Sequence, residues 1–279
     1  MKNIVAIHDI SCFGKCSLTV ALPILSAAGI ETAVIPTAVL STHTGGFSGY
    51  TYRDLTEDIM PIFRHWQSLG LKFDAAYSGF LGSPEQLGIV EEIFRELAAQ
   101  GSLIVVDPVM ADDGKLYSTF DENFPAGMRR LCERADIIVP NLTEAALILG
   151  EPYREGPYTR EYIEEILTKL AAIPKKLAVL TGVYFEGDEG RLGAACIDVK
   201  TRKTEYALAE RVPGSYHGTG DVFASALAAG LLLGREPQAA MQRAADFTAA
   251  AAKRTLDNGT DRRYGVAFEE GLGTLQYMS

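Results

Sequence analysis

Short runs of β-branched and other apolar residues alternate along this chain with longer segments in which apolar positions recur at helical spacing. The short runs predict buried strands over residues 4–7, 31–36, 73–77, 102–107, 136–139 and 177–181. The longer segments predict helices over 17–28, 55–69, 84–100, 143–149, 159–173, 221–234 and 237–255, with the end of a short helix at 129–134. Two more strands, 193–199 and 204–208, flank the charged turn 200–203 and predict an antiparallel hairpin.

This alternation of strands and helices is typical of a mostly parallel sheet covered by helices on both faces. The fold class is therefore α/β, with a small antiparallel edge at the hairpin. No Pro/Ser-rich linker, repeat or low-complexity tract divides the chain, so we expect residues 1–279 to form a single domain. In open sheets of this kind, ligands bind beyond the carboxyl ends of the strands.

The composition narrows the class of partner. Hydrophobic residues make up 47% and charged residues 22% of the chain, and the formal net charge is −10, which disfavours nucleic acid as a partner. The N-terminal apolar run is too short for a membrane helix or a signal peptide, and the four cysteines are scattered. We expect a cytoplasmic protein with no membrane partner. Cys12 and Cys16 lack a second pair with zinc-ligand spacing and are expected to be buried small hydrophobes.

The most informative segment is a glycine-rich turn, Gly218-Thr219-Gly220-Asp221, which leads directly into the apolar helix predicted from Asp221. Successive small residues let backbone N–H groups converge on one point, and a helix N-terminus adds partial positive charge. The turn therefore suits an anion, and Asp221 stands where it can take a proton from an attacking hydroxyl. The alternative is that Asp221 is an ordinary first-turn helix residue and the glycines only shape the turn.

Four segments together resemble the vitamin B6 kinases (pyridoxal/pyridoxamine kinases) of the ribokinase-like superfamily. The turn at 218–221, followed by Phe223-Ala224-Ser225-Ala226, is similar to the superfamily's catalytic signature. The other segments are 107–117, which begins Asp-Pro-Val and includes a flap; 140–145, with the Pro-Asn-x-x-Glu element; and 40–45, similar to a Ser-Asn-His-Thr segment of the B6 pocket. The resemblance covers nearly the whole chain and implies a ribokinase-like three-layer sandwich.

The resemblance implies ATP-dependent phosphorylation of the 5′-hydroxyl of pyridoxal, pyridoxamine or pyridoxine, the activity of a pyridoxal kinase. In this scheme Asp221 is the base, and the N–H groups of Gly218, Thr219 and Gly220 stabilise the transferring phosphoryl group. Asp107 and Glu144 are the implied ligands of Mg²⁺. The residues implied to contact ATP are Asp107, Asn141, Glu144, Thr181, Gly182, Gly218 and Gly220. A monovalent cation and a homodimer are further family traits.

On the vitamer side, the resemblance implies contacts from Thr44, Tyr77 and Asp221, with Tyr77 as a wall of the pocket. His43 is expected to order its loop by hydrogen bonding rather than to shuttle a proton. Asp9 stands where better-known B6 kinases carry a Ser that contacts the ring. Its carboxylate could pair with a pyridinium nitrogen or an aminomethyl group, which would favour pyridoxamine.

Other functions compete with this interpretation. A hydroxymethylpyrimidine kinase of thiamine synthesis shares the fold, but that branch resembles Gly-Thr-Gly-Cys at the turn, where this chain has Asp221. A sugar kinase is disfavoured because no N-terminal lid insertion is visible. A non-catalytic B6-binding protein would not need Asp221, Glu144 and Asn141 all intact. A Rossmann dinucleotide site and a P-loop are disfavoured because neither glycine pattern is complete near the first strand.

Overall fold

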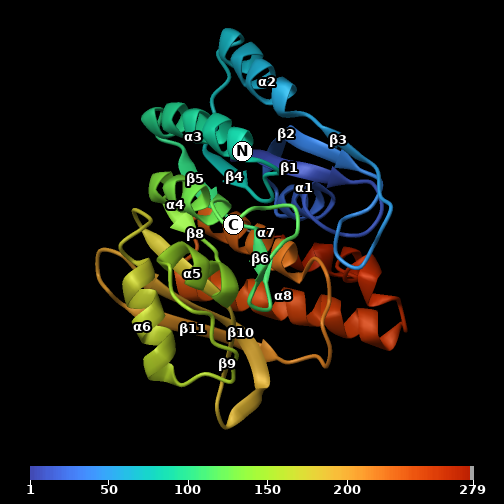
Figure 1. Cartoon of the computed structure of the whole chain (residues 1–279), viewed down its shortest axis with the longest axis vertical. Helices are drawn as coiled ribbons and strands as arrows, with labels where there is room; N and C mark the ends of the chain where they lie inside the picture. Colours follow the sequence, from blue (N-terminus) through green and yellow to red (C-terminus); the bar gives the residue numbers. More distant parts are fainter. Residues whose placement is uncertain (277–279) are drawn as a thin grey trace.

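The computed structural model describes residues 1–276 and is built around a nine-stranded sheet with the strand order β11-β10-β9-β8-β5-β4-β1-β2-β3 (Figure 1). The strands are β1 (Asn3–Ser11), β2 (Glu31–Leu40), β3 (Tyr52–Asp54), β4 (Ala75–Ser78), β5 (Leu103–Val106), β8 (Ile137–Ile138), β9 (Leu177–Phe185), β10 (Asp188–Asp198) and β11 (Thr204–Glu210). A separate two-stranded hairpin pairs β6 (Ala111–Asp112) with β7 (Lys115–Leu116). The helices are α1 (Leu18–Ala27), α2 (Thr56–Ser68), α3 (Pro84–Ala99), α4 (Phe124–Arg134), α5 (Leu142–Leu149), α6 (Arg160–Leu170), α7 (Thr219–Leu232) and α8 (Pro237–Asp257), followed by the 3₁₀ turns η1 (Arg262–Tyr264) and η2 (Glu269–Leu275).

The six central strands, from β2 to β9, run parallel, which confirms the predicted α/β class. The predicted hairpin forms as the antiparallel pair β10 and β11, and β10 also pairs antiparallel with β9. Strand β3, antiparallel to β2 at the opposite edge, was not predicted. All three of its residues are exposed, so it carries no alternation of apolar and polar positions that would reveal a strand.

Two separate hydrophobic clusters cover the two faces of the sheet. Helices α2 to α6 contribute buried residues to one cluster, for example Phe63, Phe94 and Leu167. Helices α1, α7 and α8 contribute to the other, for example Ile24 and Leu227. This is the predicted three-layer arrangement (Figure 1). Helix α7 is apolar almost all round because it packs against α1 and α8 as well as the sheet.

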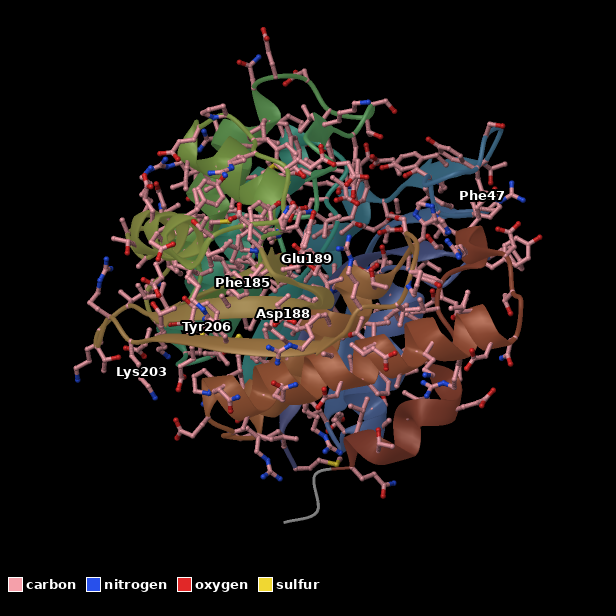
Figure 2. The ribbon with its side chains drawn as sticks, turned by 90° about the horizontal axis from the view of Figure 1, so that it is seen from below. Phe47, Phe185, Asp188, Glu189, Lys203 and Tyr206 are labelled. Atoms are coloured by element: carbon pink, nitrogen blue, oxygen red, sulfur yellow. The ribbon has the colours of Figure 1, made fainter. Side chains whose placement is uncertain are left out.

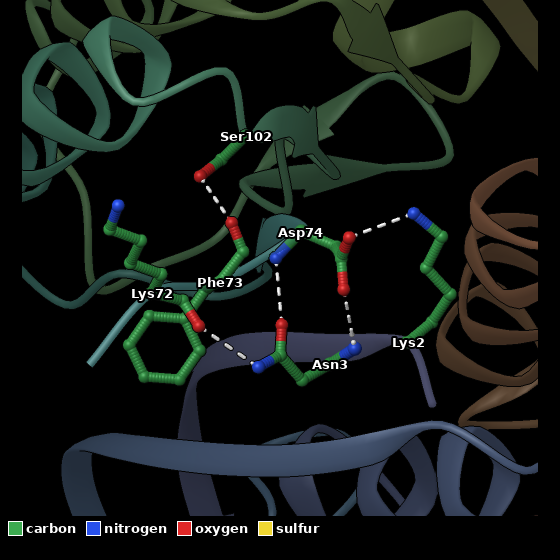
Figure 3. A network of polar contacts seen from close by, with 6 residues as sticks. All are labelled: Lys2, Asn3, Lys72, Phe73, Asp74 and Ser102. Atoms are coloured by element: carbon green, nitrogen blue, oxygen red, sulfur yellow. Dashed lines mark hydrogen bonds and ion pairs between the residues drawn. The ribbon is translucent and has the colours of Figure 1, made fainter.

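Polar contacts tie the amino ends of the parallel strands together. Asp74, just before β4, accepts hydrogen bonds from the Asn3 backbone N–H at 3.0 Å and from the Lys2 ammonium at 2.8 Å. The Asn3 side chain in turn accepts from the Asp74 N–H at 2.8 Å, and Ser102 donates to the carbonyl of Phe73 at 2.6 Å (Figure 3). These contacts lie at the sheet edge opposite the carboxyl ends, where the candidate chemistry gathers.

At the antiparallel edge of the sheet, an arginine packs against two aromatic rings. The guanidinium of Arg160 lies 4.7 Å from the ring centroid of Phe185 and 4.9 Å from that of Tyr206. Figure 2 shows both rings on this edge, close to Asp188. Over residues 1–276, none of the helices combines the length and apolar character needed to cross a bilayer.

Candidate active site

A cavity of about 530 Å³ opens at the carboxyl ends of the parallel strands and brings most of the sequence-predicted residues together. The lining includes, from that prediction, Asp9, Thr44, Asp107, Asn141, Glu144, Thr181, Gly218, Thr219, Gly220 and Asp221. It also includes six acidic side chains, whereas none of the lining residues in the described chain is Lys or Arg. A phosphorylated ligand bound here would need backbone N–H donors or a metal ion to balance its charge.

The glycine-rich turn forms the start of α7. Gly218 caps the helix with φ 77°, a left-handed conformation that favours glycine. A side chain there would also collide with the backbone, because an added Cβ would lie 2.0 Å from the carbonyl oxygen of Lys15. The Thr219 hydroxyl donates to the carbonyl of Tyr216 at 3.1 Å, and no side chain caps the helix. The first N–H groups of the helix therefore have no intrahelical partner, and the residues that carry them line the cavity.

Asp221 lies in the first turn of α7, beside Ser17. Burial raises the pKa of Asp221 to about 7, although a hydrogen bond from the Ser17 backbone N–H opposes the shift and the charge of Asp9 adds to it. Ser17 has φ 54°, an uncommon conformation for a residue with a side chain. A carboxyl with a pKa near neutrality, facing a cavity, is suited to exchange a proton with a ligand.

Asp9 is buried at the end of β1, with 4% of its surface exposed. The Ser11 hydroxyl donates to its Oδ2 at 3.4 Å, whereas its Oδ1 has no hydrogen-bond partner among the described residues. Burial raises the pKa of Asp9 to about 6, partly opposed by a hydrogen bond from the Ser17 side chain. The site therefore contains a buried carboxylate oxygen that lacks a hydrogen-bond donor among the described residues.

Glu144 and Asn141 form a capping box at the start of α5. The Asn141 side chain accepts from the Glu144 N–H at 2.9 Å, and Glu144 Oε2 accepts from the Asn141 N–H at 2.8 Å. Burial raises the pKa of Glu144 to about 8, with the backbone N–H groups of Asn141 and Met110 opposing the shift. Burial, followed by the charges of Glu144 and Asp221, raises the pKa of Asp107 well above its usual range. A cation would stabilise both carboxylates.

The predicted flap is the β6–β7 hairpin, which is tied to the same helix start. Met110 N–H donates to Glu144 Oε1 at 3.1 Å, Asn141 Nδ2 donates to the Ala111 carbonyl at 2.8 Å, and the Gly114 N–H donates to the Thr143 hydroxyl at 2.9 Å. Asn141 and Glu144 thus cap a helix and anchor the flap at once.

Three sequence-predicted residues are placed differently from expectation. Tyr77 is fully buried and packs edge-on against His8, 4.5 Å between ring centroids, so it lies beneath the cavity and is no part of its lining. Thr181 and Gly182 do not end a strand, because β9 keeps its pairing with β10 as far as Phe185 after its parallel partner β8 has ended. Thr181 still lines the cavity, whereas Gly182 does not.

His217 lines the cavity and was not predicted from the sequence. His43 does hydrogen-bond in its loop region, as expected, but its partner is the carbonyl of Arg263 at 2.6 Å. His217 lies beside it, 5.2 Å between ring centroids. Cys12 is exposed, and Cys16 is half-buried and lines the cavity, so the expectation that both are buried was wrong. The signal for His217 was its place directly before the glycine-rich turn.

Comparison with known proteins identifies the family. Residues 23–265 match the model of the phosphomethylpyrimidine kinase family. The chain belongs to this family. A family protein from Bacteroides thetaiotaomicron, described as a phosphomethylpyrimidine kinase and solved with pyridoxal, is 36% identical with a TM-score of 0.93; the match covers 98% of this chain and 95% of that one.

Other family relatives are pyridoxal kinases. The structure of the enzyme from Lactobacillus plantarum is 35% identical with a TM-score of 0.88, and the match covers 99% of this chain and 96% of that one. The pyridoxal kinase of Vibrio vulnificus is 29% identical over 260 residues, covering 88% of this chain and 85% of that protein. Proteins of this family thus include B6 kinases, and the family's name does not decide between a pyrimidine and a pyridine substrate.

Proposed function

We propose that this chain is a pyridoxal kinase, which transfers the γ-phosphoryl group of ATP to the 5′-hydroxyl of a vitamin B6 vitamer. The observation that carries the proposal is the position of Asp221. It lies at the N-terminus of α7, in one cavity with the glycine turn and the buried pair Asp107 and Glu144. The likeness to pyridoxal kinases over nearly the whole chain supports this function.

In this proposal Asp221 takes the proton of the 5′-hydroxyl as the hydroxyl oxygen attacks the γ-phosphorus, while the bond from that phosphorus to the β–γ bridging oxygen breaks and ADP leaves. The backbone N–H groups of Gly218, Thr219 and Gly220 donate to the oxygens of the transferring group, where negative charge must be balanced. The left-handed Gly218 and its close approach to Lys15 support this role, because they fix the direction of the turn.

ATP would lie along the side of the cavity formed by Asp107, Asn141, Glu144 and Thr181, with Gly182 just beyond it. Over residues 1–276 no group of three or more His, Cys, Asp or Glu side chains is arranged to enclose an ion. Asp107 and Glu144 would therefore hold Mg²⁺ together with phosphate oxygens and water, as this ion is usually bound. When bound, Mg²⁺ neutralises phosphate charge. The lining's lack of Lys and Arg fits that requirement.

The vitamer would occupy the side lined by Asp9 and Thr44. The free Oδ1 of Asp9 is suited to accept from a pyridinium N–H or an ammonium group of the substrate. Tyr77 supports the floor from below and is not proposed to touch the ring. A monovalent cation and a homodimer, both suggested by the resemblance to B6 kinases, complete the proposal, together with a single kinase domain over the whole chain.

A second candidate is a hydroxymethylpyrimidine kinase. The observation in its favour is the family model, which is that of phosphomethylpyrimidine kinases. Asp221 at the turn and the pyridoxal-bound relative favour the B6 reaction.

The test is phosphorylation by purified protein, with Mg-ATP and separately pyridoxal, pyridoxamine, pyridoxine and hydroxymethylpyrimidine. We expect that the protein phosphorylates at least one B6 vitamer, and that the kcat/KM for that vitamer exceeds the kcat/KM for hydroxymethylpyrimidine. Turnover of hydroxymethylpyrimidine alone would move the protein to the second candidate. Tight binding of a vitamer without turnover would mean that the chain is a binding protein and that the role of Asp221 is wrong.

A further inference from the structure

The segment that follows α8 turns back toward the cavity and is held firmly at its base. The Ala267 N–H donates to the Thr255 hydroxyl at 2.7 Å, and the Arg254 guanidinium donates to the Ala267 carbonyl at 2.8 Å. Val266 and Phe268 on either side are buried in the core under the sheet. The residues just before them, Arg262–Tyr264 (η1), are therefore presented on a rigid support. We call these three residues the C-terminal strap.

Two backbone carbonyls of the strap accept hydrogen bonds from two different loops. The Arg263 carbonyl contacts Nε2 of His43 at 2.6 Å, and the Tyr264 carbonyl accepts from the Lys15 N–H at 3.0 Å. A carbonyl oxygen can only accept, so Nε2 of His43 must carry the proton. In the neutral imidazole, Nδ1 is then an acceptor.

Side chains of the strap extend these contacts. The Tyr264 ring lies 5.0 Å from Phe13 and 6.3 Å from Phe47, the latter stacked, and the Arg262 guanidinium lies 4.9 Å from the ring centroid of Tyr216. Figure 2 shows Phe47 at the side of the molecule away from Lys203 of the antiparallel edge. The strap thus contacts three segments: the loop after β1, which carries Phe13 and Lys15, the loop after β2 and the turn before α7.

Gly265 makes this close approach possible. Its φ is 88°, and an added Cβ would lie 2.7 Å from Cβ of Lys15 and 2.9 Å from the Lys15 carbonyl oxygen. The same carbonyl lies against Gly218, so Lys15 is held between the strap and the catalytic turn. An ion pair between Lys15 Nζ and Glu269 at 2.8 Å adds a further connection.

We propose that the C-terminal strap is a positioning element for the substrate end of the cavity. It holds His43 as the Nε2–H tautomer and joins the loop bearing His43 and Phe47 to the turn at 214–218. The substrate would then meet a cavity wall that is already ordered. Nε2–H of His43 is engaged by the Arg263 carbonyl, so the neutral ring has Nδ1 as an acceptor and no unused donor. This role rests on the proposed function, since it assumes that the cavity receives a small molecule.

The kinetic test uses Tyr264→Ala and Gly265→Ala, with Leu256→Ala as the matched control. Leu256 is 40% exposed near the end of α8, close to the 38% of Tyr264, and has no place in the cavity lining. We expect Tyr264→Ala to raise KM for the vitamer about tenfold through lost ring contacts and loop order, with kcat and the KM for ATP unchanged. Gly265→Ala should raise the vitamer KM and lower kcat as well, because it displaces Lys15, whose carbonyl lies against Gly218. A purely structural role would lower thermal stability without that selective change in KM.

A second measurement needs neither turnover nor a variant that folds. Imidazole ¹⁵N shifts of protein labelled at its four histidines report the tautomer of each ring. We expect His43 to carry its proton on Nε2 near neutral pH, and a proton on Nδ1 instead would overturn the proposal. So would folded strap variants with an unchanged vitamer KM. If the wild-type protein phosphorylates no vitamer, the proposed function fails, and the strap is then tested by the tautomer and by the Kd for pyridoxal.

Discussion

Replacing the carboxyl group of Asp221 by an amide tests the proposed chemistry most directly. Asp221→Asn keeps the size of the side chain and an oxygen that can accept from the Ser17 N–H, so the start of α7 should persist. It removes the only group placed to receive the hydroxyl proton in the proposal. Loss of a general base costs about 10²–10⁴-fold in kcat, equivalent to about 3–5 kcal/mol of activation free energy. KM for ATP should change little.

The pH dependence follows from the same residue. Burial raises the pKa of Asp221 to about 7, and only the deprotonated form can act as a base. The fraction in that form rises from about a tenth at pH 6 to about nine-tenths at pH 8, so kcat/KM should increase about tenfold over this interval. The increase should vanish in Asp221→Asn.

The assay is initial-rate kinetics with Mg-ATP and the best vitamer between pH 5.5 and 9, with Asp257→Asn as a control. Asp257 is exposed at the end of α8, so its variant should match the wild type. A variant Asp221→Asn that retains kcat within about tenfold of the wild type, below the range for a general base, would refute the assignment. A retained pH limb would show that another group titrates.

Four further outcomes follow from the site. Asp107→Asn should abolish Mg-ATP turnover and yet raise the free energy of unfolding at alkaline pH, measured by urea denaturation without Mg²⁺, because it removes a carboxyl group whose ionisation is disfavoured in the folded protein. The metal-free wild type should also lose stability as pH rises from about 4 to 8. The folded pKa values of Asp9, Asp221 and Glu144 are raised to about 6, 7 and 8, so the unfolded chain releases these protons first. Constant stability over that range would contradict the shifts. Gly218→Ala should lower kcat about 10²-fold in a folded protein, since it displaces the anion-binding turn. Tyr77→Phe should leave the vitamer KM unchanged, because Tyr77 is fully buried. A large rise in that KM would show that Tyr77 does form a wall of the pocket.

Some of the site could be predicted because its signals are local. Asn141 and Glu144 stand three residues apart before an apolar run, a spacing that forms a capping box wherever a helix starts. The glycine turn before α7 is equally local and indicated Asp221, whereas Asp9 and Asp107 were indicated by the resemblance to B6 kinases; all three line the cavity. Their convergence follows from the sheet, because parallel strands end at the same edge.

The placement of Tyr77 and of β9 needed the tertiary structure. Tyr77 sits on a strand buried on both faces, where alternation of apolar and polar residues is lost and the direction of a side chain cannot be read. The extension of β9 to Phe185 depends on pairing with β10, which the hydrophobic pattern of β9 alone does not report.

The sequence by itself determined the layers of this protein, the parallel core of its sheet, and the carboxylates and glycine turn at the sheet's carboxyl edge. These depend on hydrophobic periodicity and on turn and cap chemistry within a few residues of one another. Only the tertiary structure decided which side chains line the cavity and which distant segments of the chain meet beside it. His43 and Arg263 meet across 220 residues of chain through a backbone carbonyl, which every residue type possesses, so no sequence pattern records that contact.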